Sequence, residues 1–94
     1  MQNSEITIPI GSIGLSGELQ MAPKGPLVIF AHGSGSSRFS PRNRFVASVI
    51  YEAGIGTLLI DLLTPAEDGH RERVFDIPLL AGRLVAATRW ARER

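Results

Sequence analysis

Apolar and polar positions alternate along the first part of the chain. Isoleucines recur at every second position of 5–10, and after the turn signal Gly11-Ser12 the alternation continues through 13–21. A period of two is typical of a half-buried strand, and a short turn containing glycine between two such segments is typical of a hairpin. We therefore expect an antiparallel hairpin with strands over about 5–10 and 13–21.

Two continuous apolar runs follow the hairpin. The first is Leu27-Val28-Ile29-Phe30-Ala31, and the second is Gly56-Thr57-Leu58-Leu59-Ile60-Asp61. An unbroken apolar run is expected of a parallel strand that is covered on both faces. The runs 27–31 and 56–61 are therefore predicted to be buried strands of a mainly parallel sheet.

Apolar residues at helical spacing predict two helices, over about 41–53 and 77–92. The first is preceded by Ser40 as a cap and ended by Gly54, and the second is preceded by Asp76 as a cap. The residues that repeat at helical spacing are Phe45, Val46, Val49, Ile50 and Ala53 in the first helix, and Ile77, Leu80, Leu84, Ala87 and Ala91 in the second. The segment 62–75 is expected to be a polar loop.

The predicted elements follow the order strand, strand, strand, helix, strand, helix. A hairpin thus leads into a β-α-β-α unit. Such alternation favours the α/β class, with a mainly parallel sheet and helices on both of its faces.

Composition and charge narrow the class of protein. The 94 residues are 44% hydrophobic and 20% charged, which is ordinary for one globular domain and argues against disorder or a membrane span. The formal net charge of +1 gives no strong attraction to nucleic acid or anionic membrane. No cysteine is present, so a disulfide, a thiolate zinc site and a cysteine nucleophile are excluded. The polar N-terminus lacks a basic signal region, and we expect a cytoplasmic protein that binds neither nucleic acid nor membrane.

Candidate chemistry lies in the loop His32-Gly33-Ser34-Gly35-Ser36-Ser37. This loop leaves the carboxyl end of a predicted buried strand, where ligands bind in open α/β sheets, and enters a predicted helix. Glycine and serine let the backbone turn sharply and point N–H groups into the crevice. Such amides stabilise an oxyanion or hold a phosphate, and a turn without any function is a third interpretation.

Other ligand motifs do not fit the sequence. No Gly-Lys-Ser/Thr closes the loop, so it is not a P-loop. The third glycine of the dinucleotide motif is absent, and Asp61 lies past a longer helix than that motif uses. The carboxylates and histidine within 67–72 match no known metal-ligand spacing. We expect neither a cofactor nor a metal.

Four segments resemble the dienelactone hydrolase-like branch of the α/β-hydrolases, and together they span most of the chain. They are 27–37 with its His-Gly loop, 41–43, 57–64 and 75–80. The ordered set is much more specific than the His-Gly pair alone. The resemblance implies an α/β-hydrolase-type three-layer sandwich, of which this chain holds the first four strands in the order 1-2-4-3. It also implies hydrolysis of a carboxylic ester or lactone through an acyl-enzyme in the full-length parent.

The resemblance assigns roles to residues of the loop. The backbone amides of Ser34 and Gly35 correspond to one half of the oxyanion hole, and the other half follows the nucleophile. His32 and Gly33 correspond to residues that organise the loop, and His32 is not the catalytic base. Asp61 is a further candidate for orienting the loop, although an aspartate at the end of a strand more often caps the segment that follows it.

The catalytic triad of the family comes from later strands. No Gly-x-Ser-x-Gly elbow occurs in the 94 residues. We therefore expect residues 1–94 to be a truncated, N-terminal half of the hydrolase domain, without nucleophile, acid or catalytic histidine and inactive alone. The alternatives are a non-catalytic fragment or assembly module, and a small phosphate-binding domain.

The implied strand order leaves 27–31 at an exposed edge of the sheet. Apolar edges invite pairing with another chain. We expect a homo-oligomer, or other self-association, through this strand. The small-molecule ester or lactone is the partner expected of the full-length parent.

Overall fold

The computed structural model describes residues 4–22, 26–32, 40–68 and 76–93. The strands are β1 (Ser4–Ile10), β2 (Ile13–Gln20), β3 (Leu27–His32) and β4 (Gly56–Asp61), and the helices are α1 (Pro41–Glu52), α2 (Pro65–Asp68) and α4 (Ile77–Arg92). The hairpin, the strands over 27–31 and 56–61 and the two long helices are thus present as expected. β4 is buried as predicted, but the predicted burial of 27–31 is corrected, because residues 27–30 of β3 are half-buried and Ala31 is exposed. Helix α2 is a correction, because it lies in the segment 62–75 that we expected to be loop throughout.

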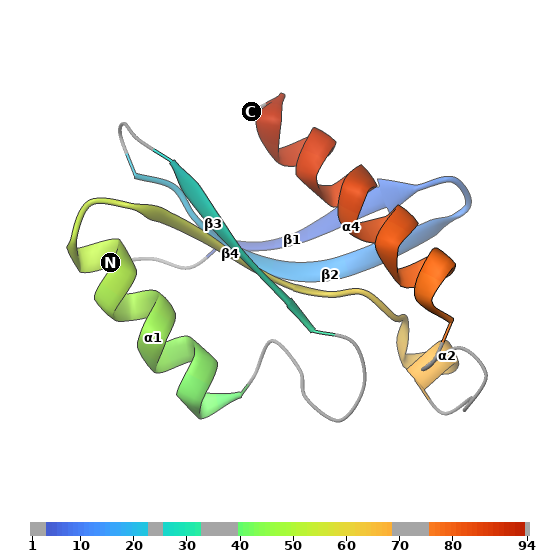
Figure 1. Ribbon diagram of the computed structural model, residues 1–94, viewed down its shortest axis with the longest axis horizontal. Helices are drawn as coiled ribbons and strands as arrows, with labels where there is room; N and C mark the ends of the chain where they lie inside the picture. The colour runs from blue at the N-terminus through green and yellow to red at the C-terminus, as the bar shows by residue number, and fades with distance from the viewer. Residues whose placement is uncertain (1–3, 23–25, 33–39, 69–75, 94) are drawn as a thin grey trace.

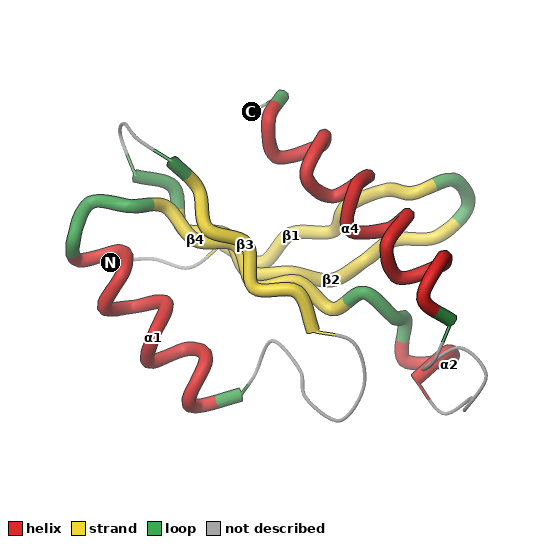
Figure 2. Tube along the Cα trace, viewed as in Figure 1, coloured by secondary structure: helices red, strands yellow, loops and turns green. Residues whose placement is uncertain are grey.

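The four strands form one sheet in the order β1-β2-β4-β3. β1 and β2 are the antiparallel hairpin, β2 continues antiparallel to β4, and β3 lies parallel to β4. This is the mixed sheet and the strand order that the resemblance to α/β-hydrolases implies. Helices α1 and α4 lie on opposite sides of the sheet (Figure 1), and the tube view shows the strands crossing between them (Figure 2).

The hydrophobic core lies between the sheet and α4. Its buried members come from β1, β2, β4, the turn after β4, and α4: Ile8, Leu15, Leu58, Ile60, Leu62 and Ala87. Leu80, Trp90 and Ala91 of α4 pack against them from the helix side. Trp90 therefore contributes to the packing of α4 on the sheet.

The other face of the sheet, toward α1, buries several polar side chains. Glu18 and Gln20 of β2, Thr57 of β4 and His32 of β3 are all buried there. Glu18 forms an ion pair with Arg44 of α1, which compensates the cost of burying its charge. The sheet therefore has an apolar face under α4 and a partly polar face under α1.

Part of the apolar stripe expected of each helix points away from the sheet. In α1, Phe45 is 68% exposed and Val49 is 51% exposed, while the small Ala47 is the residue that is buried. In α4, Ile77 is 66% exposed and Leu84 is 37% exposed. The spacing identified both helices correctly, but their orientation depends on contacts that periodicity does not contain.

Local capping signals set the helix ends. The side chains of Ser40 and Asp76 accept hydrogen bonds from backbone N–H groups in the first turns of α1 and α4, and a proline follows each cap. Gly54 has φ 92°, the left-handed conformation in which glycine ends a helix without strain. These positions agree with the boundaries that the sequence predicts.

In the described part of the chain, no helix has both the length and the apolar character needed to cross a membrane.

Candidate functional site

The residues predicted to act together lie at the carboxyl end of the parallel strand pair. His32 is the last residue of β3, Asp61 is the last residue of β4, and the two are partners in the register. Gly33, Ser34 and Gly35 lie outside the described residues. The described part of the site consists of the two ends of the loop, at His32 and at the start of α1.

His32 is held firmly at the first end of the loop. Its side chain is on the face covered by α1, and the residue is 4% exposed. Its backbone carbonyl accepts a hydrogen bond of 2.9 Å from the N–H of Leu62. Its imidazole Nε2 lies 2.8 Å from Nδ2 of Asn43. His32 is thus hydrogen-bonded in place, as a residue that organises a loop must be.

The bond to Asn43 fixes the tautomer of the imidazole. With the amide in this orientation Nδ2 donates to Nε2, so the proton of a neutral imidazole is on Nδ1. Nδ1 is buried and has no hydrogen-bond partner among the described residues. A buried donor without a partner costs about 1–3 kcal/mol.

Asn43 joins the two ends of the loop. Its backbone N–H donates to Oγ of Ser40, the cap of α1, over 3.4 Å, and its side chain contacts His32. The same residue thus contacts the end of β3 and the beginning of α1. Asn43 was not among the site residues expected from the sequence, although 41–43 is one of the segments that carry the resemblance.

Asp61 occupies the position next to His32 across the β3–β4 pair. It is half-buried at the end of its strand. The first turn of α1, at the positive end of the helix dipole, begins at Pro41. Its dipole favours negative charge nearby, whereas the carboxylate of Asp61 opposes it.

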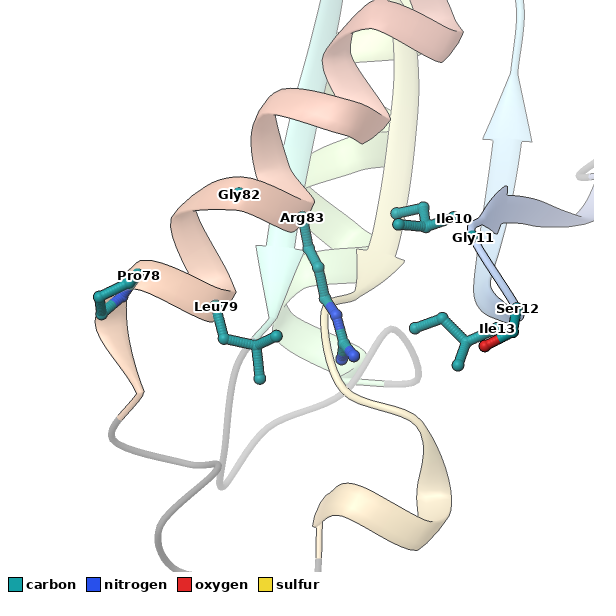
Figure 3. A pocket seen from close by; sticks show the side chains of 8 residues that line it. All are labelled: Ile10, Gly11, Ser12, Ile13, Pro78, Leu79, Gly82 and Arg83. Carbon is teal, nitrogen blue, oxygen red and sulfur yellow. The ribbon is translucent and has the colours of Figure 1, made fainter.

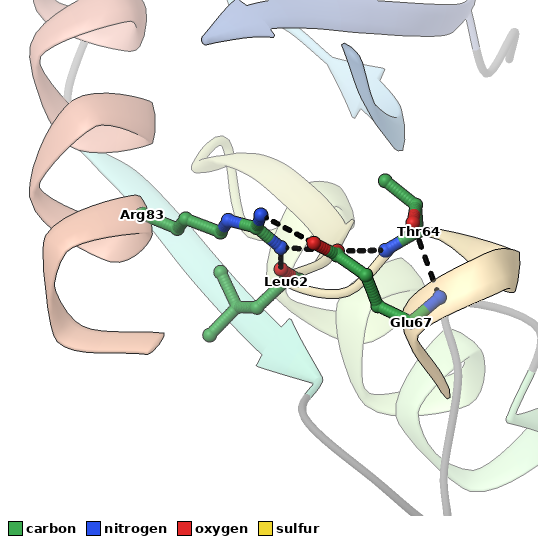
Figure 4. Close-up of polar contacts among 4 residues, drawn as sticks. All are labelled: Leu62, Thr64, Glu67 and Arg83. Atoms are coloured by element: carbon green, nitrogen blue, oxygen red, sulfur yellow. Dashed lines mark hydrogen bonds and ion pairs between the residues drawn. The ribbon is translucent and has the colours of Figure 1, made fainter. Parts of the chain in front are cut away.

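A second cluster of polar groups connects α4 to the segment that follows β4, and its hydrogen bonds have a structural role (Figure 4). Arg83 Nη1 donates to the carbonyl of Leu62 over 2.9 Å, and its two Nη atoms lie 2.5 and 2.7 Å from the carboxylate oxygens of Glu67. Glu67 also accepts from the N–H of Thr64, whose Oγ1 accepts from the N–H of Glu67. This reciprocal pair is a capping box, and it explains why α2 forms.

The ion pair changes the acidity of Glu67. Its hydrogen bonds to the Arg83 guanidinium lower the pKa of the Glu67 carboxyl from 4.5 to about 2. The same bonds raise the pKa of Arg83. Both groups stay charged at neutral pH, so neither is suited to proton transfer. We expected a polar loop over 62–75, but Glu67 lies in helix α2 and forms an ion pair with Arg83, so the expectation is corrected at this residue.

A pocket of about 480 Å³ lies between the β1–β2 turn and the beginning of α4 (Figure 3). Its lining residues are Ile10, Gly11, Ser12, Ile13, Pro78, Leu79, Gly82 and Arg83. The guanidinium of Arg83 is already bonded to Glu67 and Leu62, so this lining offers little chemistry. The pocket also lies beside β1 and β2, whereas the loop leaves β3 at the opposite edge of the sheet. It is not part of the candidate site.

Among the described residues, no group of three or more histidine or carboxylate side chains is arranged to hold a metal ion.

Comparison with known proteins gives two kinds of relatives, and no protein-family model matches the sequence. Two curated proteins of Mycobacterium tuberculosis, from strains H37Rv and CDC 1551, are each 50% identical to the chain over 92 residues. Both are provisionally named phosphoribosyl transferases. The match covers 96% of this chain and 20% of each relative, so the chain spans about a fifth of their length.

The solved structures are similar over nearly the whole chain. The crystal structure of a dienelactone hydrolase from Anabaena variabilis has 50% sequence identity and a TM-score of 0.86, over 95% of this chain and 44% of that one. Est1E from Butyrivibrio proteoclasticus has 21% identity and a TM-score of 0.78, over 96% of this chain and 35% of that one. The second likeness shows the fold alone.

Proposed function

We propose that this chain, which has the fold of the N-terminal portion of a dienelactone hydrolase-like α/β-hydrolase, supplies half of an oxyanion hole for ester or lactone hydrolysis. The backbone amides of Ser34 and Gly35 are the donors. His32, Gly33 and Asp61 organise the loop that carries them. The nucleophile, the acid and the catalytic histidine come from residues other than these 94, and the chain alone does not turn over an ester.

The observation that carries this proposal is the 50% identity to a dienelactone hydrolase across almost the entire chain. The geometry of the loop ends is compatible with it. His32 is buried at the carboxyl end of β3 and bonded to Asn43 of α1, so both ends of the loop are anchored on the same side of the sheet. Anchored ends favour preorganised amides, which is what oxyanion stabilisation requires.

Phosphoribosyl transfer is the competing assignment, because the mycobacterial relatives carry that name. The matched region is only a fifth of each relative. The remaining four-fifths leave ample room for a separate transferase domain, so the name need not describe the matched region. The chain is also 50% identical to the dienelactone hydrolase over 95% of its length, which favours the hydrolase-type assignment for this region.

The proposal is tested in a chimera that replaces the matched N-terminal region of the Anabaena dienelactone hydrolase by this chain. We expect the chimera to hydrolyse p-nitrophenyl acetate, and the 94-residue chain alone to show no turnover above buffer. Ser34→Pro removes a backbone N–H and should lower kcat of the chimera by roughly a hundred- to a thousandfold. Its matched control, Ser34→Ala, keeps the N–H and should stay within about threefold of the unchanged chimera.

Two outcomes would contradict the oxyanion role of Ser34. One is a Ser34→Pro chimera that is folded and fully active, and the other is a Ser34→Ala chimera as impaired as Ser34→Pro. Circular dichroism and the melting temperature of each variant separate a local effect from loss of fold.

The phosphate-binding alternative has its own measurement. Inorganic phosphate or ribose 5-phosphate at millimolar concentration would raise the melting temperature of the chain if the loop held a phosphate. We expect no rise beyond that produced by sulfate at equal ionic strength. A specific rise, lost in the Ser34→Pro chain, would favour phosphate binding over oxyanion stabilisation.

A further inference from the structure

Two consecutive residues at the beginning of α1 bond to two different strands of the sheet. Nδ2 of Asn43 lies 2.8 Å from Nε2 of His32, at the end of β3. The guanidinium of Arg44 forms an ion pair with the buried carboxylate of Glu18 in β2. Because β4 lies between β2 and β3, these contacts hold the start of α1 on both sides of β4. The start of α1 therefore has a fixed position relative to the carboxyl end of β3.

Asn43 contributes to the start of the helix through its backbone, and its side chain is directed elsewhere. Oγ of Ser40, the cap of α1, accepts from the backbone N–H of Asn43. A glutamate or glutamine at this third helical position commonly folds its side chain back onto the cap residue. The amide of Asn43 instead contacts the imidazole of His32. One residue thus bonds to the cap of α1 and to the last residue of β3.

This contact allows the His32 imidazole only one arrangement of its proton. Nε2 accepts from the Asn43 amide, so a proton on Nε2 would set two N–H groups against each other. Asp61 is the register partner of His32, but it does not accept from Nδ1, which has no hydrogen-bond partner among the described residues. In the described part of the chain, Asn43 is therefore the residue that selects the tautomer.

The same bond makes His32 unsuited to proton transfer. A general base needs a lone pair that can reach the proton it removes. A neutral imidazole has one such lone pair on its ring nitrogens, and in His32 this lone pair on Nε2 already accepts from Asn43. The residue is also 4% exposed. His32 is therefore suited to holding the end of β3 in place and not to taking a proton from a substrate.

We propose that Asn43 is a positioning residue of the oxyanion-hole loop, which keeps His32 in the Nδ1–H tautomer and fixes the end of β3 from which the loop departs. This inference rests on the proposed function. Asn43 contacts the residues at both ends of the loop, His32 through its side chain and Ser40 through its backbone. Loss of the side chain releases only the first end. Backbone amides that are less firmly preorganised stabilise an oxyanion less well.

The nuclear magnetic resonance spectrum of the imidazole nitrogens tests the tautomer directly. The chain contains two histidines, His32 and His70, so a ring-labelled His70→Gln chain reports on His32 alone. We expect the Nδ1–H form. Asn43→Asp on the same background keeps a polar group against Nε2, but a carboxylate only accepts hydrogen bonds, so this change should place a proton on Nε2.

The kinetics of the chimera with the Anabaena hydrolase test the positioning role. Asn43→Ala should lower kcat and kcat/KM by the same factor, roughly tenfold, because oxyanion amides act on the transition state rather than on the bound substrate. Ala47→Gly is the matched control, since it weakens the same helix and removes no side-chain hydrogen bond. The control should lower the melting temperature and leave kcat within about twofold of the unchanged chimera.

The proposed function and the role of Asn43 fail on different results. An inactive chimera, or a fully active Ser34→Pro chimera, would overturn the proposed function, whereas an Nδ1–H spectrum would still show that Asn43 holds His32. An Nε2–H tautomer in the His70→Gln chain, or a mixture of tautomers, would overturn the role of Asn43. An Asn43→Ala chimera with unchanged kcat, beside an impaired Ser34→Pro chimera, would overturn it too. Equal losses of kcat in Asn43→Ala and Ala47→Gly would point to a general loss of stability and would likewise overturn it.

Discussion

Arg83 and Glu67 show what a single residue pair contributes to this small molecule. Arg83 comes from α4, and it ties the turn after β4 to helix α2 through the carbonyl of Leu62 and the carboxylate of Glu67. The arginine side chain is 9% exposed and that of Glu67 is 19% exposed. A charge as enclosed as that of Arg83 is tolerated only when it is paired, so the pair acts as a unit.

The pair should make stability depend on pH in the acidic range. The pKa of Glu67 is about 2 in the folded chain, against an ordinary value of 4.5. Between pH 4.5 and pH 2 the carboxyl is therefore mostly protonated in the unfolded chain and mostly ionised in the folded chain. The pair contributes up to about 2–3 kcal/mol to the free energy of unfolding. This contribution is complete at pH values above the ordinary pKa of 4.5 and is lost as the pH falls toward the folded-state pKa of about 2. Glu67→Gln should therefore destabilise the chain at pH 7, and the difference should shrink between about pH 4.5 and 2.

Urea unfolding at fixed protein concentration and several pH values measures this effect. Glu52→Gln, which changes an exposed glutamate of α1, is the matched control and should alter stability by less than about 0.5 kcal/mol. A Glu67→Gln destabilisation that stayed constant down to pH 3 would contradict the assigned cause.

His32 and Asn43 show how far the sequence informs the candidate site at the scale of residues. His32 follows an apolar strand and precedes a glycine, so its position at the carboxyl end of the sheet was predictable from local sequence. Its partner Asn43 lies 11 positions away, and their contact depends on how α1 lies against β3. No local pattern encodes that packing, and Asn43 was therefore not predicted as a site residue.

At the scale of elements, local signals predicted the helix ends well and the helix faces poorly. Caps and turn residues act on their own neighbours, so Ser40, Asp76 and Gly54 were identified correctly. The capping box Thr64-Pro65-Ala66-Glu67 is an equally local signal, and it could have revealed α2. The buried face of α1 was not predictable, because it is set by Ala47 and by an ion pair to β2 rather than by the apolar stripe.

The cap of α4 provides a prediction at this scale. Oδ1 of Asp76 accepts from the N–H of Leu79 over 3.1 Å, at the positive end of the longest helix. Asp76→Ala should lower the free energy of unfolding by about 1 kcal/mol, and Asp76→Asn, which keeps an acceptor, by much less. Urea titrations at pH 7 provide the comparison. Equal losses for the two variants would mean that the side-chain hydrogen bond is not what stabilises this end.

At the scale of the whole molecule, the described strands form one sheet in which β1 and β3 are the outer strands. The strand order and the α/β class were predictable, because alternation and the order of elements leave few arrangements, and the resemblance selected one of them. The exposure of the apolar side chains of α1 was not predictable, because it depends on how α1 lies over β4.

The alternation along β3 gives its two sets of backbone groups different roles. Groups at even positions form the ladder to β4, whereas those at odd positions point away from it. A proline scan along this strand should therefore give losses of stability with a period of two, large at positions 28 and 30 and smaller at positions 29 and 31. The tolerance of this strand to a change of backbone thus alternates from one residue to the next.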